Sequence, residues 1–329
     1  MSDSLSDSSP APTILQALLD AIQALPAIPG DAQRCFHGRG GAHPGCEAWT
    51  LDWYAPVWLL TCFAPVSDTT LAQAEAVHQS LAAHWATLAP EQPLNLVLQH
   101  RDEARADTRV LAGAVPDPHV VSEAGARFRV HLMRGYNHGL FLDMAEGRRW
   151  VREHIGTSLD TEPNARFKVL NLFAYTCAFS VAAQQAGATQ VINVDMAAGA
   201  LGIGKANHQL NGLGAGVSFL PHDIFSSWGK IGRLGPYQLV IADPPSYQKG
   251  SFVAEKDYAR LVRRLPGLLM PGGHALLCLN SPKHTPAFIQ DLVAAEAPGL
   301  QFVQRLANPA SFPDAQPERS LKVLVFRLS

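Results

Sequence analysis

Three aspartates stand at or just beyond the ends of apolar segments, where carboxylates can bind a ligand rich in hydroxyl and amino groups. Asp195 ends the run QVINVD, Asp223 follows VSFLPH, and Asp243 ends LVIAD. Carboxylate oxygens at such positions accept hydrogen bonds from ribose hydroxyls. One aspartate at a strand end is commonly a cap, but three on successive predicted strands favour a nucleoside-binding site.

The segment NLFAYTCAFS at 171–180 leads from an apolar run into a predicted helix. The free N–H groups and the positive dipole end of a helix N-terminus receive a carboxylate or another anion. No glycine lies between Asn171 and Ser180, so the GxGxxG pattern that lets a pyrophosphate approach the backbone is absent. A nucleoside with a small charged tail is therefore favoured over a nicotinamide or flavin dinucleotide.

These residues need a sheet that brings several strand ends to one edge. Beyond Phe167, apolar runs alternate with helical stretches, and prolines 244 and 245 must end the strand before them because proline donates no ladder hydrogen bond. The alternation predicts an α/β fold with a mostly parallel, doubly wound sheet, which binds ligands outside the carboxyl ends of its strands. The expected strands are 168–174, 190–196, 217–220, 238–245, 274–281, 301–306 and 321–329, with one of the helices spanning 258–269.

The residues before Ala126 predict a smaller α+β domain. Residues 1–10 read as a disordered tail, 11–125 as the small domain and a candidate for substrate binding, and 126–329 as the main domain. Within the small domain we expect a helix at 11–25, two strands around a turn, a helix at 70–88 and a strand at 94–101. Residues 115–121, VPDPHVV, read as a linker or a crossing segment.

The composition limits the function classes. The chain has 329 residues, 47% hydrophobic and 16% charged, with a net charge of −2 and a pI near 6.7. This balance gives no overall attraction to nucleic acid and leaves only local basic patches for such contact. No apolar stretch reaches the ~20 residues of a membrane span, and the first residues lack a secretory signal pattern. Five scattered cysteines indicate reduced thiols and a cytoplasmic location.

The segments NLFAYTCAFS, VDM, ANHQLNGL, HDIF and IADPPSY together resemble class I S-adenosylmethionine-dependent methyltransferases. The closer resemblance is to bacterial 23S ribosomal RNA large-subunit methyltransferases that modify cytosine carbon-5 or a guanine ring nitrogen. GYNHGLFLDMAEGRRWV is similar to their G-x-x-T-G-x-F-L-D-x-R segment, and HPGCEAWTLDWYAPVWLLTCF to their middle domain. From Phe36 onward, the resemblance implies a seven-stranded methyltransferase sheet, S-adenosyl-L-methionine as cofactor, S-adenosyl-L-homocysteine as product and ribosomal RNA as partner.

The resemblance also implies cofactor-binding roles for residues that match the family's motifs. It places five residues of one loop around the methionine part, namely Asn171, Phe173, Ala174, Tyr175 and Thr176. Asp195 would hold the ribose hydroxyls, Met196 would pack on the adenine, and Asp223 with Ile224 would meet the adenine amino group. The near side of the pocket would be lined by Phe141, Asp143 and Arg148, and Asp243 is also expected among the cofactor-binding residues.

The expected catalytic residues are Asp243, Pro244, Pro245 and Tyr247, which in the family face the transferred methyl group and the acceptor. The proline pair fixes backbone carbonyls beside Asp243, where they can accept from an amino group or ring N–H. Tyr247 offers a ring on which a flipped base can stack. Methyl transfer is an in-line displacement, so positioning of the acceptor is the main task of such residues.

The loop after the strand at 274–281 bears on the acceptor atom. Methylation of cytosine carbon-5 needs a cysteine that adds to the ring, but Ser281 stands near the expected thiol position and Cys278 is expected to be buried. LNSPKH is more similar to the S-N-N-K segment of the guanine-nitrogen branch, which implies that Asn280 and Lys283 hold a purine edge; a polar turn at the strand end with a solvated lysine is the alternative. A nitrogen acceptor is therefore favoured over cytosine carbon-5.

Two further positions depart from the family. Cys177 stands where glycine is usual, and we interpret it as a packing residue in a loop that still closes. His138 stands where threonine is usual, and we interpret it as a hydrogen-bonding turn residue. No metal is expected, because the spacing of Cys35, His37, His43 and Cys46 fits no standard zinc pattern.

Two alternatives stay open at this point. One is a methyltransferase that acts on a small molecule or a protein, which the neutral-to-acidic charge favours. The other is a non-catalytic RNA- or ribosome-binding protein on a methyltransferase scaffold, against which the set of Asp195, Asp223 and Asp243 speaks. The sequence does not determine the oligomeric state, and a dimer is compatible with it.

Overall fold

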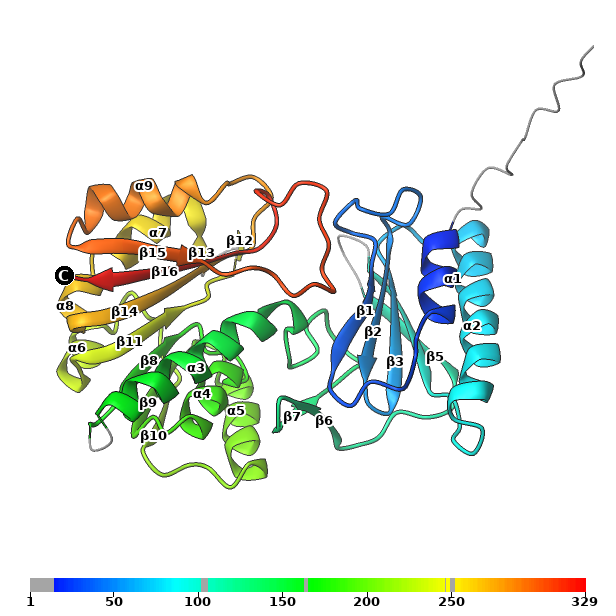
Figure 1. Cartoon of the computed structure of the whole chain (residues 1–329), viewed down its shortest axis with the longest axis horizontal. Helices are drawn as coiled ribbons and strands as arrows, with labels where there is room; N and C mark the ends of the chain where they lie inside the picture. The colour runs from blue at the N-terminus through cyan, green and yellow to red at the C-terminus, as the bar shows by residue number, and fades with distance from the viewer. Residues whose placement is uncertain (1–14, 102–105, 163–164, 246, 249–251) are drawn as a thin grey trace, which may run out of the picture.

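The computed structural model describes residues 15–101, 106–162, 165–245, 247–248 and 252–329. The tail predicted at 1–10 and the start of the predicted helix at 11–25 lie outside these residues. Figure 1 shows two lobes, one built mainly from the N-terminal third and one from the remainder of the chain.

A five-stranded sheet with two helices on one face forms the N-terminal lobe. Its strand order is β1-β2-β3-β4-β5, and only the β3–β4 pair is parallel. The elements are α1 (Gln16–Gln23), β1 (Gln33–His37), β2 (Trp49–Tyr54), β3 (Val57–Cys62), α2 (Asp68–Leu88), β4 (Leu96–Arg101) and β5 (Ala106–Ala112). The helices pack on the sheet through apolar residues such as Leu18, Leu81 and Trp58. Ser67 caps α2, where its hydroxyl accepts from the N–H of Thr70.

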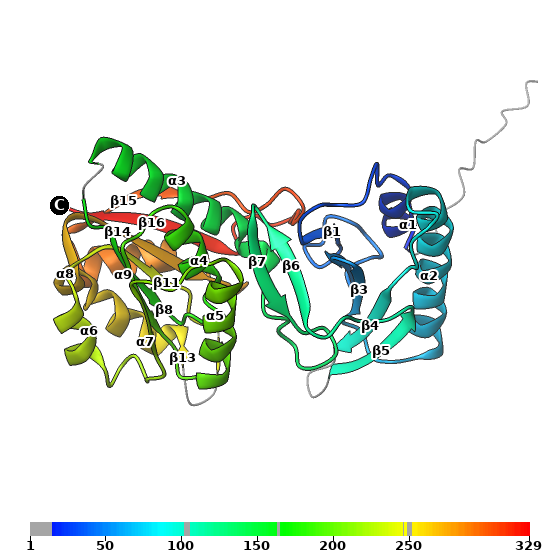
Figure 2. The same cartoon turned by 90° about the horizontal axis from the view of Figure 1, so that it is seen from below.

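A two-stranded ribbon, β6 (His119–Glu123) with β7 (Ala126–Val130), lies between the lobes (Figure 2). The interpretation of 115–121 as a linker or crossing segment agrees with its place between the lobes, but residues 119–121 are part of a paired strand and not a loop. The prolines of this segment end at Pro118, and the following residues alternate in burial, with Val121 packed against Phe128 and Leu59 in one core cluster. Burial of β-branched side chains outweighed the loop signal of the neighbouring prolines.

The C-terminal lobe contains a seven-stranded sheet in the order β10-β9-β8-β11-β14-β16-β15. The first five strands are mutually parallel, while β16 runs antiparallel to both β14 and β15. The strands are β8 (Lys168–Leu172), β9 (Gln190–Val194), β10 (Val217–Leu220), β11 (Tyr237–Ala242), β14 (Leu269–Leu279), β15 (Leu300–Arg305) and β16 (Lys322–Leu328). This mixed sheet confirms the predicted α/β class.

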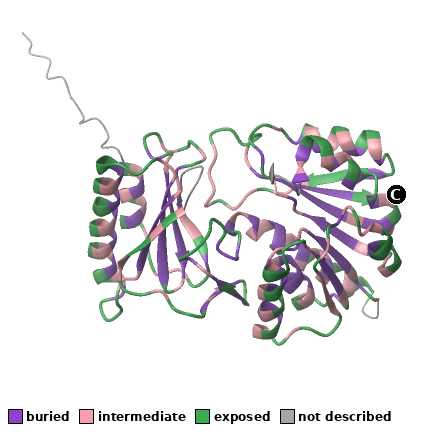
Figure 3. Ribbon diagram, turned by 180° about the vertical axis from the view of Figure 1, so that it is seen from behind, coloured by how far each residue is buried: buried purple, intermediate pink, exposed green. Residues whose placement is uncertain are grey.

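Helices lie against this sheet, and alternate strand residues enter two separate cores. Leu239 and Ile241 belong to the cluster that also holds Val151 of α3 and Ala183 of α4. Val240 and Ala242 belong to the cluster with Tyr258 of α7. The central strands of this sheet are buried along most of their length and are purple in Figure 3, whereas the edge strands β10 and β15 are intermediate or exposed. The remaining elements are η1 (Leu142–Met144), α3 (Ala145–Thr161), α4 (Ala178–Gln185), α5 (Ala198–Leu210), α6 (Trp228–Leu234), β12 (Tyr247–Gln248), β13 (Phe252–Val253), α7 (Ala254–Val262), α8 (Leu265–Leu268) and α9 (Ala287–Glu296).

The helix predicted over 258–269 differs from the structure. It is two helices, because α7 ends at Val262 and α8 starts afresh at Leu265 with Pro266 in its first turn. Proline fits the first turn of a helix but not its interior, so the break precedes it. No helix among the described residues is long and apolar enough to cross a membrane.

Candidate active site at the strand ends

Four neighbouring strands end at one edge of the large sheet and surround a cavity of about 600 Å³. The last residue of β8 is level with the last residues of β9 and β11, so the residues that follow them meet. Fifteen predicted residues line this cavity: Phe141, Asp143, Arg148, Phe173, Ala174, Tyr175, Thr176, Asp195, Met196, Asp223, Ile224, Asp243, Pro244, Pro245 and Asn280.

The loop after β8 is shaped by three non-glycine residues in the left-handed region. Phe173, Tyr175 and Cys177 have φ values of 57°, 46° and 61°, a conformation that costs an L-residue roughly 1–2 kcal/mol. Hydrogen bonds hold it there. The N–H of Ala174 donates to the carbonyl of Val194 at 3.1 Å, and the N–H of Tyr175 donates to the Asp195 carboxylate at 2.8 Å.

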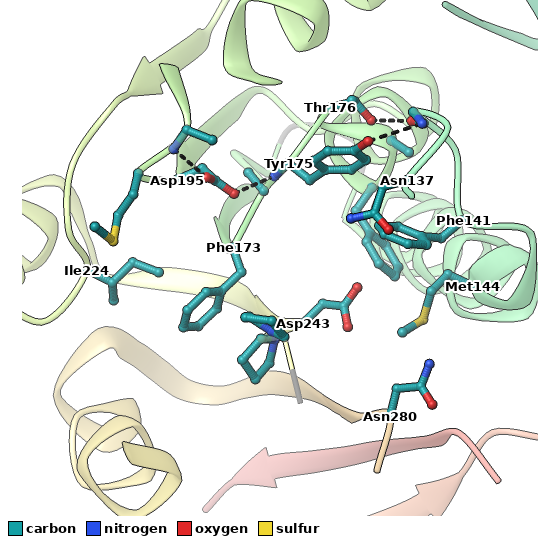
Figure 4. A pocket seen from close by; sticks show the side chains of 18 of the residues that line it. Asn137, Phe141, Met144, Phe173, Tyr175, Thr176, Asp195, Ile224, Asp243 and Asn280 are labelled. Carbon is teal, nitrogen blue, oxygen red and sulfur yellow. Dashed lines mark hydrogen bonds between the residues drawn. The ribbon is translucent and has the colours of Figure 1, made fainter. Parts of the chain in front are cut away.

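Thr176 and Tyr175 also fasten this loop to the segment before α3 (Figure 4). The Thr176 hydroxyl donates to the carbonyl of Gly139 at 2.5 Å, and the Tyr175 hydroxyl accepts from the N–H of the same glycine at 3.1 Å. Gly139 has φ 98° and an added Cβ would stand 2.8 Å from a backbone oxygen, so glycine is required there. The two walls of the cavity are therefore joined by paired hydrogen bonds.

Asn171 lies beneath the loop and differs from the expectation. It is buried and does not line the cavity, because its amide donates to Asn193 at 2.9 Å. Asn193 in turn donates to the Ser180 hydroxyl at 3.0 Å, and Ser180 donates to His208. The His208 ring donates to the carbonyl of Gly204 at 2.7 Å, which fixes its tautomer. This buried network joins β8, β9, α4 and α5.

The end of the cavity next to β9 and β10 is lined by the residues that follow these two strands. Both oxygens of Asp195 accept backbone N–H groups, from Tyr175 and Ala197 at 2.8 Å each, and each oxygen retains acceptor capacity. Met196 is 54% exposed beside it, and Ile224 is buried across the cavity. Asp223 is exposed and accepts from the N–H of Phe225 at 2.9 Å. This end offers an apolar slot between two carboxylates.

At the end of the cavity next to β11, burial disfavours the ionised form of two carboxyl groups, those of Asp243 and Asp143. Burial, and then the neighbouring Asp143, raise the pKa of Asp243 to about 7. Burial also raises the pKa of Asp143. Figure 4 shows the Asp243 carboxyl group between Phe173 and Met144, with Asn280 opposite. One proton is therefore available at this pair near neutral pH.

The charge of Arg148 lowers the pKa of both members of this pair, but its guanidinium is held by a residue that sequence reasoning missed. Its guanidinium is buried and donates to both oxygens of Glu123, one bond being 2.7 Å, and to the carbonyl of Phe141 at 2.8 Å. Glu123 lies in β6, so a bidentate ion pair fastens the ribbon between the lobes to α3. Nothing in the sequence signals a pairing between residues so far apart.

The remaining predicted residues fall elsewhere. Lys283 is exposed and does not line the cavity. Tyr247 lies in β12, and its side chain is outside the described part of the chain. Cys278 is fully buried in β14, where burial raises the pKa of its thiol well above the usual value. No cluster of metal-ligating side chains is found among the described residues. Sequence reasoning also missed Asn137, Met144, Ala178, Phe179 and Phe225, which line the cavity.

Comparison with known proteins adds the family. A family model described as S-adenosylmethionine-dependent methyltransferase matches residues 33–327. The chain is 27% identical over 299 residues to ribosomal RNA large subunit methyltransferase I of Aeromonas salmonicida (strain A449), covering 86% of this chain and 72% of that protein. It is 35% identical over 188 residues to ribosomal RNA large subunit methyltransferase K/L of Psychrobacter sp. (strain PRwf-1), covering 54% of this chain and 22% of that protein.

Solved structures show the same fold at low sequence identity. SMU.776, crystallised with S-adenosylhomocysteine, has a TM-score of 0.78 and 21% identity, with 97% of this chain and 83% of that chain covered. A SAM-dependent methyltransferase from Agrobacterium tumefaciens has a TM-score of 0.62 and 19% identity, with 92% and 91% covered.

Proposed function

This chain belongs to the S-adenosylmethionine-dependent methyltransferase family, and on that premise we propose that it methylates a base of ribosomal RNA, at a nitrogen atom. The methyltransferase activity and the cofactor follow from the family. The RNA substrate rests on relatives that are named ribosomal RNA methyltransferases, the first of which the chain covers to nearly three quarters and the second to about a fifth.

The strand-end cavity fits the cofactor. Asp195 has spare acceptor capacity on both carboxylate oxygens beside the exposed Met196, which suits a ribose next to an adenine ring. Asp223 stands across the slot for the adenine amino group, and Ile224 supplies an apolar wall. The loop from Phe173 to Thr176 would then surround the methionine part, whose carboxylate meets the start of α4. When bound, S-adenosylmethionine supplies an electrophilic methyl group.

The acceptor side would be formed by Asp243, Pro244, Pro245 and Asn280, with Tyr247 beyond them. A carboxyl group with a pKa near 7 can accept a hydrogen bond from a base amino group or take a proton from it. Asn280 points toward the same space and has both a donor and an acceptor for a base edge. These groups would position the acceptor in line with the methyl group, which is the larger part of what such an enzyme must do.

A nitrogen acceptor is supported by the burial of Cys278. Covalent activation of cytosine needs a thiolate at the cavity, and no cysteine lines the cavity among the described residues. The Cys278 carbonyl accepts from the buried Tyr258 hydroxyl at 2.9 Å, so this residue is fixed within the sheet. Ser281, at the expected thiol position, is also buried.

We propose further that the large sheet is the doubly wound, seven-stranded methyltransferase sheet of residues 126–329, and that residues 11–125 form a domain that presents the substrate. The location in the cytoplasm stays a prediction from the cysteine pattern.

The single observation that carries the proposal is the convergence of Asp195, Asp223 and Asp243 on one cavity. The test is transfer of labelled methyl groups from S-adenosylmethionine to unmodified ribosomal RNA, followed by nucleoside mass spectrometry. A methylated guanine, lost in Asp243→Ala while S-adenosylhomocysteine binding persists, is the expected result. Asp291→Ala, an exposed carboxylate on α9, is the matched control. Label in 5-methylcytosine would overturn the nitrogen acceptor, and absence of label with intact cofactor binding would overturn the RNA substrate.

A further inference from the structure

A second pocket, of about 440 Å³, adjoins the strand-end cavity. It lies between the strands β1–β4, the segment 136–143 and the loop 306–321, which reaches across to the N-terminal lobe in Figure 1. The loop is tied there by the N–H of Ala315, which donates to the carbonyl of Gly40 at 2.8 Å. The two pockets share Asn137, Phe141, Asp143 and Asn280, so a ligand can extend from one into the other.

Several guanidinium groups line this pocket, and one of them is fully neutralised. Arg34 donates to both oxygens of Asp52, at 2.7 and 2.9 Å, and a third nitrogen donates to His37 at 2.7 Å. Burial, and then the Arg34 charge, lower the pKa of His37 to about 4, so this ring is a neutral acceptor. Arg34 and Asp52 therefore form a closed structural unit in the pocket wall.

Arg101 is oriented without being neutralised. Its Nε donates to the Gln99 side chain at 2.5 Å, and a terminal nitrogen donates to His138 Nε2 at 2.8 Å. Burial, and then Arg101 itself, lower the pKa of His138 to about 3, so His138 is neutral and donates from Nδ1 to the carbonyl of His131. Both partners of Arg101 are thus uncharged. The Arg101 guanidinium is therefore held in position but forms no ion pair with a carboxylate among the described residues.

Arg39 lies at the same aromatic ring as Arg101. Its guanidinium lies 3.9 Å from the centroid of the Phe63 ring, and the Arg101 guanidinium lies 5.6 Å from the same ring. The centroid of the Tyr136 ring is 5.9 Å from the Arg101 guanidinium. Burial, and then the Arg34 charge, lower the pKa of Arg39, and no carboxylate of the described residues forms an ion pair with it. The Arg39 and Arg101 charges repel each other, and Arg39 is among the groups that lower the pKa of Arg101; an anion bound between the two would offset this repulsion.

We propose that this pocket holds one nucleotide of an RNA chain, with a backbone phosphate bound by Arg39 and Arg101 and the base extended past Phe141 and Asn280 toward Asp243. The inference rests on the proposed function and adds the site that reads the substrate. A phosphate accepts several N–H bonds from a pair of guanidinium groups, and the shared boundary of the two pockets gives the base its path. His138, where the family usually has threonine, acts here as the positioning residue for Arg101.

The positive charges of this pocket also favour a nucleic-acid acceptor over a basic protein acceptor. A protein acceptor that presents a lysine or arginine would bring a cation against Arg39 and Arg101, which is unfavourable. A polynucleotide needs only this local cluster, and the net charge of −2 then keeps non-specific binding low. The pocket therefore supplies the basic contact that the composition as a whole does not.

The test compares Arg39→Gln, Arg101→Gln and the double variant with the wild type in the full-length protein. Arg109→Gln is the matched control, because Arg109 is an exposed arginine on the neighbouring strand β5, paired with Asp107 at 2.8 Å and absent from the pocket lining. The measurements are binding of an unmodified ribosomal RNA transcript across a salt series, S-adenosylhomocysteine binding, and KM and kcat for methyl transfer.

Each single variant is expected to weaken RNA binding about tenfold, as loss of a charge-assisted hydrogen bond would, and to lower the slope of log affinity against log salt by roughly 0.7–0.9. Affinity for S-adenosylhomocysteine should not change, and KM for RNA should rise more than kcat falls. Wild-type affinity and slope in the double variant would overturn the inference while leaving the function intact. A wild-type protein that binds S-adenosylhomocysteine but shows no salt-sensitive RNA binding would instead overturn the proposed function.

Discussion

Cys177 and Gly204 face each other between α4 and α5, and their contact predicts that substitutions at the two positions reverse one another's effect. A Cβ atom added at Gly204 would stand 2.4 Å from the Sγ atom and 3.0 Å from the Cβ atom of Cys177. Cys177 is fully buried and is held at φ 61°, so neither side can move freely. Gly204 therefore provides the space that a cysteine needs in place of the glycine usual at position 177.

The magnitudes follow from these contacts. Gly204→Ala gains about 1 kcal/mol of helix propensity but overpacks the site at a cost of ~2–3 kcal/mol, the upper part of the usual range because the 2.4 Å contact is with a buried atom, so it should destabilise the protein by about 1–2 kcal/mol. Cys177→Gly relieves roughly 1–2 kcal/mol of left-handed strain but loses a buried side chain worth a similar amount, so its net effect should be small. In that background both contacts with the Cys177 side chain are gone, the Thr176 carbonyl carbon lies 3.3 Å from the new methyl group, and Gly204→Ala should become stabilising by up to about 1 kcal/mol.

The assay is a double-mutant cycle of the free energy of unfolding in urea, with hydrogen exchange of α5 to assign the change to this lobe. The expected coupling energy is about 2–3 kcal/mol, with a change of sign for Gly204→Ala between the two backgrounds. Additive effects, or destabilisation by Gly204→Ala in both backgrounds, would refute the reasoning that the two residues share one space.

Three other predictions concern the cavity. Because the pKa of Asp243 is raised to about 7, its contribution to stability is full below its unfolded pKa near 4 and is lost as the pH rises through 7. Asp243→Asn should therefore be as stable as the wild type near pH 4 and more stable than the wild type by about 2 kcal/mol at pH 8. This is half the value for the full pKa shift, because the carboxyl group opens into the cavity. Equal stability of the two proteins at both pH values in denaturant titrations would contradict the raised pKa. Asp195→Ala should raise the dissociation constant of S-adenosylhomocysteine at least about tenfold in calorimetry. Asp160→Ala, an exposed position on α3, is the control. Unchanged affinity in Asp195→Ala would show that Asp195 does not bind the cofactor. Cys278→Ser should leave kcat nearly unchanged, whereas a loss of several orders of magnitude in a folded variant would restore the covalent cytosine mechanism.

The strand-end aspartates could be predicted from the sequence because their positions follow from local signals. A buried run that stops at Asp243 before two prolines is readable without knowledge of its neighbours, and parallel strands necessarily bring their carboxyl ends to one edge. The α/β class followed from the same alternation. The sequence therefore predicted the edge of the sheet at which the strand ends meet and the residues that lie there.

The rest depends on contacts between distant segments or on backbone geometry. The left-handed conformation of Phe173 and Tyr175 is enforced by Asp195 and Val194 from the next strand, so propensity alone could not indicate it. The ion pair of Arg148 with Glu123 crosses from α3 to the ribbon between the lobes. The pocket with Arg39 and Arg101 forms only when both lobes and the loop 306–321 are in place, which no local pattern reveals.

The most direct test of the account is whether the purified protein transfers labelled methyl groups from S-adenosylmethionine to unmodified large-subunit ribosomal RNA. We expect a single methylated guanine in nucleoside mass spectrometry, present with the wild type and absent with Asp243→Ala at equal S-adenosylhomocysteine affinity. Binding of S-adenosylhomocysteine without any label in RNA would contradict it and would direct the search to a different acceptor.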